Sequence, residues 1–153
     1  MKKNVAPTLA ALGIVAAFSL AVYAQDVKPD RAIKYRQGIM QAQGWNLGVL
    51  GAMAKGDRPY DKALATRSAT QLDQLVYMAW DGFTPGSDQG APTKAKPEIW
   101  NEQAKFKQLQ EAVQAETPKL VAAAKTGELS ELRRAIGPVA KACDNCHDDF
   151  RSK

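Results

Sequence analysis

The spacing of apolar side chains near the end of the chain constrains its fold more than any other feature of the sequence. Apolar residues and cysteines alternate at steps of three and four residues, at Leu129, Leu132, Ile136, Val139, Cys143, Cys146 and Phe150. This spacing predicts one long helix with a continuous apolar face. Because such a face must be buried against other elements, both cysteines are expected to point into the interior of the protein.

Five residues of this helix form the pattern C-x-x-C-H, namely Cys143, Asp144, Asn145, Cys146 and His147. The pattern is typical of covalent attachment of a c-type haem. Two thiols three residues apart on a helix can reach the two vinyl groups of one porphyrin, and the next residue then presents an imidazole to the iron. His147 is the only histidine in the chain, which excludes a site with two histidine ligands. The sequence therefore predicts one covalent haem c, with His147 as an axial ligand of the iron.

Haem-free functions of the two cysteines are the alternative from another class. A C-x-x-C oxidoreductase carries its cysteines at a helix N-terminus beside a βαβ unit, whereas here they lie late in a long helix. A zinc site with Cys143, Cys146 and His147 needs a fourth ligand and lacks the usual paired spacing. A structural disulfide leaves His147 unexplained. A haem-free thiol protein or a zinc-binding protein remains the competing hypothesis.

The rest of the chain predicts further helices and no strands. The expected helices cover residues 29–55, 61–80, 97–127 and 128–151, with a long loop over residues 81–97. Residues 25–153 are expected to form one domain, an all-α antiparallel four-helix bundle with haem c bound on the last helix. Gly44, Gly48 and Gly51 in the first helix indicate that something bulky packs close to its backbone.

The first 24 residues have the layout of a secretory signal peptide that is cleaved after Ala24. Lys2 and Lys3 precede an apolar stretch that runs from Leu9 to Val22. This stretch is short for a membrane span, so the mature protein is expected to have no stable membrane insertion. The net charge of +5 falls when the two lysines are removed, and no cluster of basic and aromatic residues favours nucleic acid.

Three residues of the first helix, Arg36, Gln37 and Met40, lie together near its apolar stripe. A buried arginine needs a partner, so Arg36 either pairs with a haem propionate or extends its charged end to solvent. Met40 is either a sixth ligand of the iron or a packing residue that leaves the iron five-coordinate.

Three further residues are candidates for the haem site. Trp80 and Phe83 flank the long loop, and they either wall the haem pocket or belong to an ordinary aromatic core. Arg151 lies one turn after His147, and it either pairs with a propionate or lies free at the chain end.

The motifs together resemble those of class II c-type cytochromes, and most closely those of the cytochromes c′. The resemblance spans nearly the whole domain, through KYRQGIM (34–40), GDRPYD (56–61), WDGFTPG (80–86), PEIW (97–100) and ACDNCHDDFR (142–151). It implies a periplasmic four-helix bundle, often dimeric through its first two helices. It also implies that Arg36 and Gln37 lie by a haem propionate, and that Arg151, four residues after His147, does so too. Met40 is then the residue at the distal position, on the side of the iron away from His147.

The resemblance leaves two subgroups open. Cytochromes c′ keep the distal face free of a protein ligand and bind nitric oxide or carbon monoxide there, whereas the related cytochromes c-556 use a methionine as a ligand. Residues 36–37 and 80–86 are similar to the first group, and residues 48–56 to the second.

The sequence therefore predicts a periplasmic monohaem cytochrome, not an enzyme, since no catalytic motif for an organic substrate is present. It is expected to be a homodimer, to exchange single electrons with periplasmic redox partners, and to bind nitric oxide or carbon monoxide at a five-coordinate iron. The alternative is a low-spin Met/His electron carrier of the c-556 type.

Overall fold

The computed structural model describes residues 27–153, so the predicted signal peptide, residues 1–24, lies outside the described residues. The elements are α1 (Pro29–Lys55), α2 (Lys62–Met78), a 3₁₀ turn η1 (Ala79–Gly82), α3 (Glu98–Asn101), α4 (Gln103–Thr126) and α5 (Leu129–Phe150). Over the described part of the chain there is no strand, only an isolated bridge between Ala95 and Arg151. None of the helices between residues 27 and 153 combines the length and apolarity needed to cross a bilayer.

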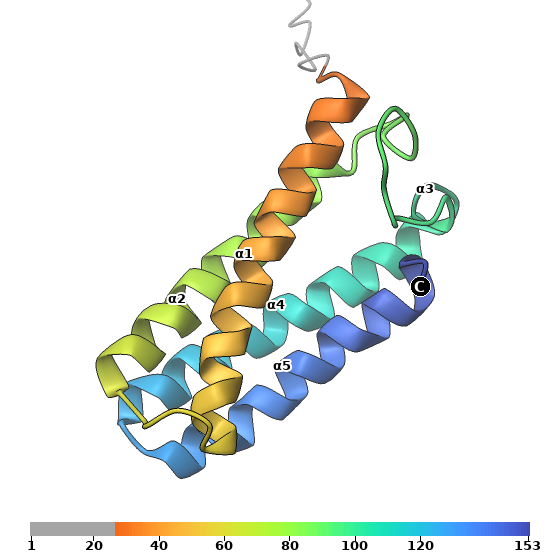
Figure 1. Ribbon diagram of the computed structural model, residues 1–153. Helices are drawn as coiled ribbons and strands as arrows, with labels where there is room; N and C mark the ends of the chain where they lie inside the picture. The colour runs from red at the N-terminus through yellow and green to blue at the C-terminus, as the bar shows by residue number, and fades with distance from the viewer. Residues whose placement is uncertain (1–26) are drawn as a thin grey trace, which may run out of the picture.

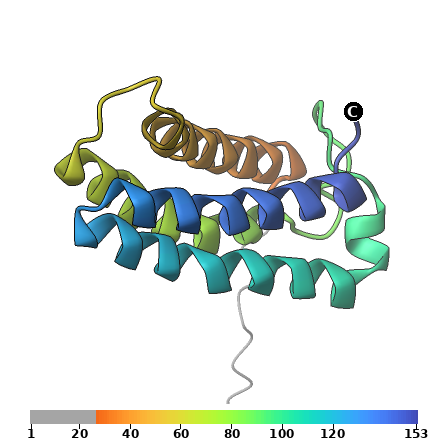
Figure 2. The same cartoon turned by 90° about the horizontal axis from the view of Figure 1, so that it is seen from below.

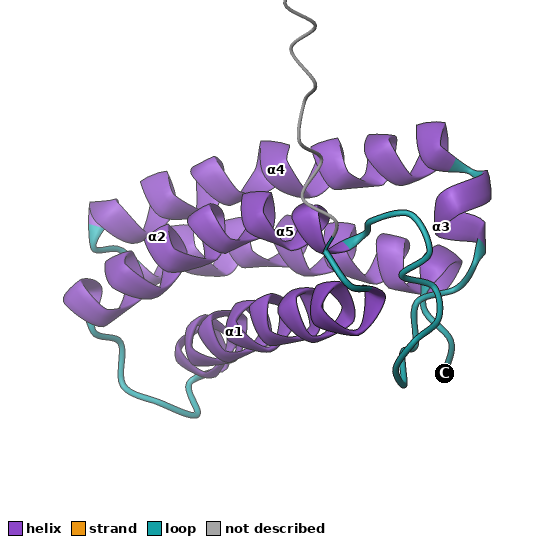
Figure 3. Ribbon diagram, turned by 90° about the horizontal axis from the view of Figure 1, so that it is seen from above, coloured by secondary structure: helices purple, strands orange, loops and turns teal. Residues whose placement is uncertain are grey.

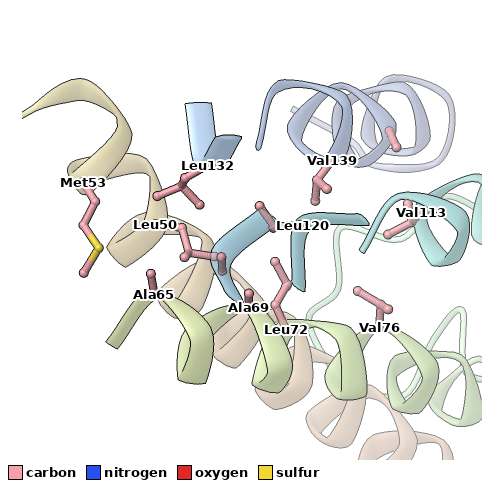
Figure 4. Packing of buried hydrophobic residues seen from close by; sticks show 12 residues of the cluster. Leu50, Met53, Ala65, Ala69, Leu72, Val76, Val113, Leu120, Leu132 and Val139 are labelled. Carbon is pink, nitrogen blue, oxygen red and sulfur yellow. The ribbon is translucent and has the colours of Figure 1, made fainter. Parts of the chain in front are cut away.

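The four long helices form an antiparallel bundle, as the sequence predicted (Figures 1 and 2). Helix α1 packs on α2 and α5, α2 packs on α4, and α4 packs on α5, so the helices enclose one core. Figure 4 shows side chains from all four helices meeting in this core, among them Leu50, Leu72, Leu120 and Leu132. Because these leucines are fully buried, they hold the bundle together at the end away from the long loop.

The predicted helix over 97–127 is wrong at one point, because the chain leaves helical geometry at Glu102. The φ and ψ angles of Glu102 are −115° and 47°, and they separate the short α3 from α4. Contacts with the loop hold α3 in place: Trp100 Nε1 donates a hydrogen bond to the carbonyl of Thr84 over 3.0 Å. The pattern of apolar residues continues through the break, so the sequence carries no sign of it.

Local signals set the ends of the long helices as predicted. Gly56 (φ 91°) and Gly127 (φ 89°) adopt the left-handed conformation that ends α1 and α4. Asp61 caps α2 by accepting a hydrogen bond from the backbone N–H of Leu64. The connection between α2 and α4 follows a longer path, which Figure 3 shows as a loop passing over one end of the bundle.

Gly82 in η1 is where the start of this loop comes closest to α1. A Cβ atom at this position would lie 2.6 Å from Cβ of Arg36 and 2.9 Å from the carbonyl oxygen of Ala32. Both are fixed parts of a helix, so neither can move aside cheaply. Glycine is therefore required for η1 to pack on α1.

Replacing Gly82 by alanine is expected to destabilise the protein by about 1–3 kcal/mol, the usual effect of overpacking. The matched control is Gly38→Ala in α1, where an added Cβ meets no atom within 4 Å. That variant is expected to gain up to about 1 kcal/mol from the higher helix propensity of alanine. Urea unfolding of the two holoproteins measures both effects, and equal stability of the two variants would contradict the close approach of η1.

Candidate haem site

A cavity of about 650 Å³ opens between α1, α4, α5 and the long loop. Its volume lies within the range of roughly 300–1,000 Å³ that is typical of cofactor pockets. Every residue that the sequence predicted for the haem site lines this cavity, namely Arg36, Gln37, Met40, Trp80, Phe83, Cys143, Cys146, His147 and Arg151. These nine residues come from three separate parts of the chain and meet at one site.

Helix α5 carries the two cysteines and the histidine to the cavity wall, as its apolar spacing predicted. The pKa of the Cys146 thiol is raised to about 11. Burial is the main cause, and the neighbouring Cys143 and Asp149 add to it. Burial also raises the pKa of Cys143, with a further contribution from Asp144. Redox-active C-x-x-C pairs need a lowered thiol pKa, so these neutral thiols do not favour a thiol oxidoreductase.

His147 lies at the cavity with a pKa below its ordinary value. Partial burial is the main cause, and the positive charge of Arg151 adds to it, while Asp144 and Asp148 oppose the shift. A lowered pKa keeps the imidazole neutral near pH 7, and a neutral imidazole has the lone pair that a metal needs. Among residues 27–153 no group of three or more histidine, cysteine or acidic side chains gathers as it would around a zinc ion.

Arg36 is 2% exposed, so the hypothesis that its charged end reaches solvent is wrong. Its Nη1 donates to the carbonyl of Gly82 (2.8 Å) and to Oγ of Ser87 (2.8 Å). Its Nη2 donates to the carbonyl of Ser87 (2.7 Å) and to Oγ1 of Thr93 (3.0 Å). The loop thus uses both terminal nitrogens of the guanidinium, and its Nε–H is the donor left over for a propionate.

The cation of Arg36 is also held between aromatic rings. Its Cζ atom lies 4.7 Å from the ring centroid of Phe83 and 5.7 Å from that of Trp100. Burial lowers the pKa of Arg36, and Asp88 partly offsets the shift. Gln37 also binds the loop to α1, because its Nε2 donates to the carbonyl of Pro92 over 2.9 Å. These loop partners could not be predicted from the sequence, because every residue has a backbone carbonyl and the sequence does not show which one accepts a hydrogen bond.

Aromatic rings form one wall of the cavity, and Trp80 and Phe83, for which the sequence left a pocket wall and an ordinary core open, both belong to it. Phe106 links them, with its ring centroid 5.6 Å from that of Trp80 and 5.0 Å from that of Phe83. Phe150 extends the cluster at 5.3 Å from Phe106. The apolar spacing of α5 placed Phe150 on its buried face, and only the fold shows that Phe106 and Phe150 both line the cavity.

The chemistry of the cavity fits a haem. Its lining is mostly apolar and aromatic, which suits a porphyrin, and it carries two neutral thiols beside one neutral imidazole. Trp80 Nε1 is buried and has no hydrogen-bond partner among the described residues. Buried N–H groups without an acceptor are rare. A carboxylate, such as a haem propionate, could accept the hydrogen bond of Trp80 Nε1.

Comparison with known proteins agrees with this site. The family model described as Cytochrome C' matches residues 31–151. Cytochrome c′ of Alcaligenes xylosoxydans xylosoxydans is 40% identical over 129 residues, covering 84% of this chain and 99% of the relative. Cytochrome c-556 of Rhodopseudomonas palustris is 34% identical over 153 residues, covering 95% of this chain and 97% of the relative.

A solved structure is similar over the same region. It is the nitric oxide complex of a leucine-to-alanine variant of cytochrome c prime from Alcaligenes xylosoxidans, with a TM-score of 0.77 and 40% identity. The likeness covers 83% of this chain and 98% of that one. The cofactor of this family is a single covalent haem c, which agrees with the cavity described above. Because the family model spans almost all of the described residues, the chain belongs to the cytochrome c′ family.

Proposed function

We propose that the protein is a periplasmic electron carrier that also binds nitric oxide or carbon monoxide at a five-coordinate haem iron. The observation that carries the proposal is a cavity lined by one imidazole, that of His147 on α5, and by the thioether of Met40 on α1. A methionine in a protein interior is more often a packing residue than a ligand. A similar protein, with 40% identity, is known as a nitric oxide complex.

The proposal gives each residue of the site a role. Cys143 and Cys146 fix the porphyrin to α5 through thioether bonds, and His147 supplies the axial nitrogen. Arg36 and Gln37 hold the loop that closes the cavity. The bound haem supplies the iron, which changes its oxidation state and offers a coordination position to a gas.

The walls of the site keep water from that iron. Trp80, Phe83 and Phe106 form a continuous aromatic surface along one side of the cavity. No turnover of an organic substrate is proposed, and the partners are redox proteins of the periplasm. The periplasmic location rests on the signal-peptide pattern of residues 1–24.

The second candidate is a low-spin electron carrier in which Met40 is the sixth ligand. Two observations favour it: Met40 lies at the cavity, and a cytochrome c-556 is 34% identical over nearly the whole chain. The two candidates differ in one bond, between the sulfur of Met40 and the iron.

Replacing Met40 by leucine separates the two candidates. We expect the wild-type protein to show a five-coordinate high-spin absorption spectrum that shifts when carbon monoxide is added to the reduced form. Met40→Leu is expected to leave the gas-free spectrum unchanged, because leucine keeps the apolar volume without the thioether.

The matched control is Met53→Leu, since Met53 is fully buried in the core and does not line the cavity. A low-spin wild-type spectrum with a methionine-to-iron charge-transfer band would overturn the five-coordinate proposal. Loss of that band in Met40→Leu, with the band kept in Met53→Leu, would assign the ligand to Met40.

A homodimer through α1 and α2 is a further part of the proposed function. Large apolar side chains are exposed on these helices: Trp45 is 76% exposed, Tyr77 51% and Met78 43%. An added Cβ at Gly48 or Gly51 of α1 would meet no atom of residues 27–153 within 4 Å, so both positions have space for a neighbour. The bulky neighbour that these glycines predicted is absent from the described residues, and a second copy would supply it.

Replacing Trp45 by glutamate is expected to convert the dimer into a monomer, because a charge buried in an interface without a partner is costly. The control is Gln108→Glu on α4, which adds the same charge at an exposed position away from α1 and α2. Sedimentation equilibrium over a range of protein concentrations gives the mass of each species. A dimeric Trp45→Glu protein, or a monomeric wild type, would refute this interface.

A further inference from the structure

The last turn of α5 is held almost entirely by one residue of the loop. A helix leaves its last four carbonyl groups without partners inside the helix, which in α5 are those of residues 147–150. The carbonyl of His147 accepts the backbone N–H of Arg151 over 3.0 Å. Lys96 supplies donors to the other three. Its Nζ donates to the carbonyls of Asp148 (3.1 Å) and Asp149 (2.9 Å), and its backbone N–H donates to Phe150 (3.0 Å).

The loop segment around Lys96 lies alongside the chain that follows α5. Ala95 and Arg151 form an antiparallel bridge, and the N–H of Ser152 donates to the carbonyl of Lys94 over 2.8 Å. Residues 94–96 thus pair with residues 150–152, next to the place where α5 ends (Figure 1). Both Lys94 and Ala95 also line the cavity, so the pairing connects the cavity wall to the end of α5.

We propose that Lys96 is a positioning residue for the axial ligand His147. By satisfying three terminal carbonyls, Lys96 keeps the last turn of α5 helical, and this turn bears the imidazole. Its positive charge at the C-terminal end of the helix adds a favourable interaction with the helix dipole. The inference rests on the proposed function in one respect, since it takes His147 as a ligand of the iron.

Other contacts at the end of α5 are weaker. Lys105 forms a salt bridge with Asp149 over 3.1 Å, but the two side chains are 50% and 39% exposed. Exposed pairs of this kind contribute little to stability. The ammonium of Lys96 instead makes two hydrogen bonds to backbone carbonyls that have no donor within the helix. The position of the last turn therefore depends on Lys96 more than on Lys105.

The test replaces Lys96 by methionine in the full-length holoprotein, which keeps most of the side-chain length and removes both hydrogen bonds of the ammonium, while the backbone N–H still donates to Phe150. The variants are built on Met40→Ala, so that the iron has no methionine ligand whichever coordination the wild type has. Lys96→Arg is the rescue variant, because a guanidinium can again donate to both carbonyls. The control is Lys107→Met, which removes the same charge from an exposed residue of α4 that forms a salt bridge with Glu111 over 3.6 Å.

Two measurements are made on each variant. Amide hydrogen exchange of Arg151 and Ser152 reports whether the end of α5 opens. We expect it to be at least about tenfold faster in Lys96→Met, because two hydrogen bonds from a charged group are lost and the loss of even one gives about that factor. The iron–histidine stretching band of the ferrous protein reports the ligand, and we expect it to broaden and move to lower frequency in Lys96→Met.

The outcomes separate the inference from the proposed function. Wild-type exchange and an unchanged iron–histidine band in Lys96→Met would overturn it, as would a failure of Lys96→Arg to restore both. Faster exchange with an unchanged band would also overturn it, because Lys96 would then stabilise the helix end without positioning the ligand. If Lys96→Met does not retain haem, Lys96→Gln keeps one donor group and is expected to show intermediate values. A methionine ligand in the wild type would refute the five-coordinate proposal and leave this result intact.

Discussion

Replacing Arg36 by methionine is expected to lower the free energy of unfolding of the holoprotein by about 3–5 kcal/mol, which places it among the most damaging single substitutions. The side chain is 2% exposed and makes four hydrogen bonds to the loop. Methionine fills much of the same volume but donates none of them. The carbonyl of Ser87 would then be buried without a donor, and that of Gly82 would keep only a 3.4 Å contact with Oγ of Ser87, at a cost of about 1–3 kcal/mol each.

The matched control for this prediction is Lys34→Met, one half-turn away on the same helix. Lys34 is exposed, and its only ion pair within residues 27–153 is a 3.8 Å contact with Asp30. Its replacement is expected to change the stability by no more than about 0.5 kcal/mol. Urea unfolding measures the stability of both variants, and limited proteolysis within residues 83–97 reports loosening of the loop.

A stable Arg36→Met protein with a protease-resistant loop would contradict the conclusion that Arg36 holds the loop on α1. Arg36→Lys gives a graded comparison, because it keeps the charge but has one nitrogen in place of the planar fork that reaches both Gly82 and Thr93. It is expected to fall between wild type and Arg36→Met. Such an order would show that the geometry of the guanidinium, and not its charge alone, holds the loop.

Much of the site could be predicted because its residues lie on helices with regular spacing. The steps of three and four residues from Leu129 to Phe150 fixed which face of α5 is buried, and Cys143 and Cys146 lie on that face. The apolar stripe of α1 likewise placed Arg36 and Met40 near a buried face, and both line the cavity. Helical periodicity is a local property of a sequence, so it can be recognised without knowledge of the tertiary structure.

The parts that could not be predicted involve the loop. The sequence predicts that Arg36 pairs with a propionate or reaches solvent, and its contacts with backbone carbonyls and hydroxyl groups of residues 82–93 are in neither prediction. Lys96 was not singled out at all, although it satisfies three carbonyls at the end of α5. Any residue offers a carbonyl, so such contacts depend on where the backbone passes and not on which residues it carries.

Replacing both Cys143 and Cys146 by alanine is expected to abolish covalent haem attachment completely. These are the only cysteines of the chain, so no other thiol can form a thioether to the porphyrin. Haem staining of a denaturing gel measures the effect, because denaturation releases a haem held by His147 alone. We expect the wild-type band to stain and the double variant to show no stain at equal protein load. Asp144→Ala is the control, since it changes the exposed residue between the cysteines and leaves both thiols.

The staining experiment also decides between the haem protein and its haem-free alternative. Both thiols have a raised pKa, so they are poor thiolate ligands for zinc and poor nucleophiles for disulfide exchange. A porphyrin also fills the cavity of about 650 Å³, which a zinc ion would leave largely open beside the aromatic wall of Trp80 and Phe106. If the wild-type protein purified from the periplasm of cells that mature c-type cytochromes carried zinc and did not stain, the thiol or zinc hypothesis would replace haem attachment. The two single variants, Cys143→Ala and Cys146→Ala, complete the experiment. Staining that is reduced in each single variant and lost only in the double variant would assign one thioether bond to each cysteine.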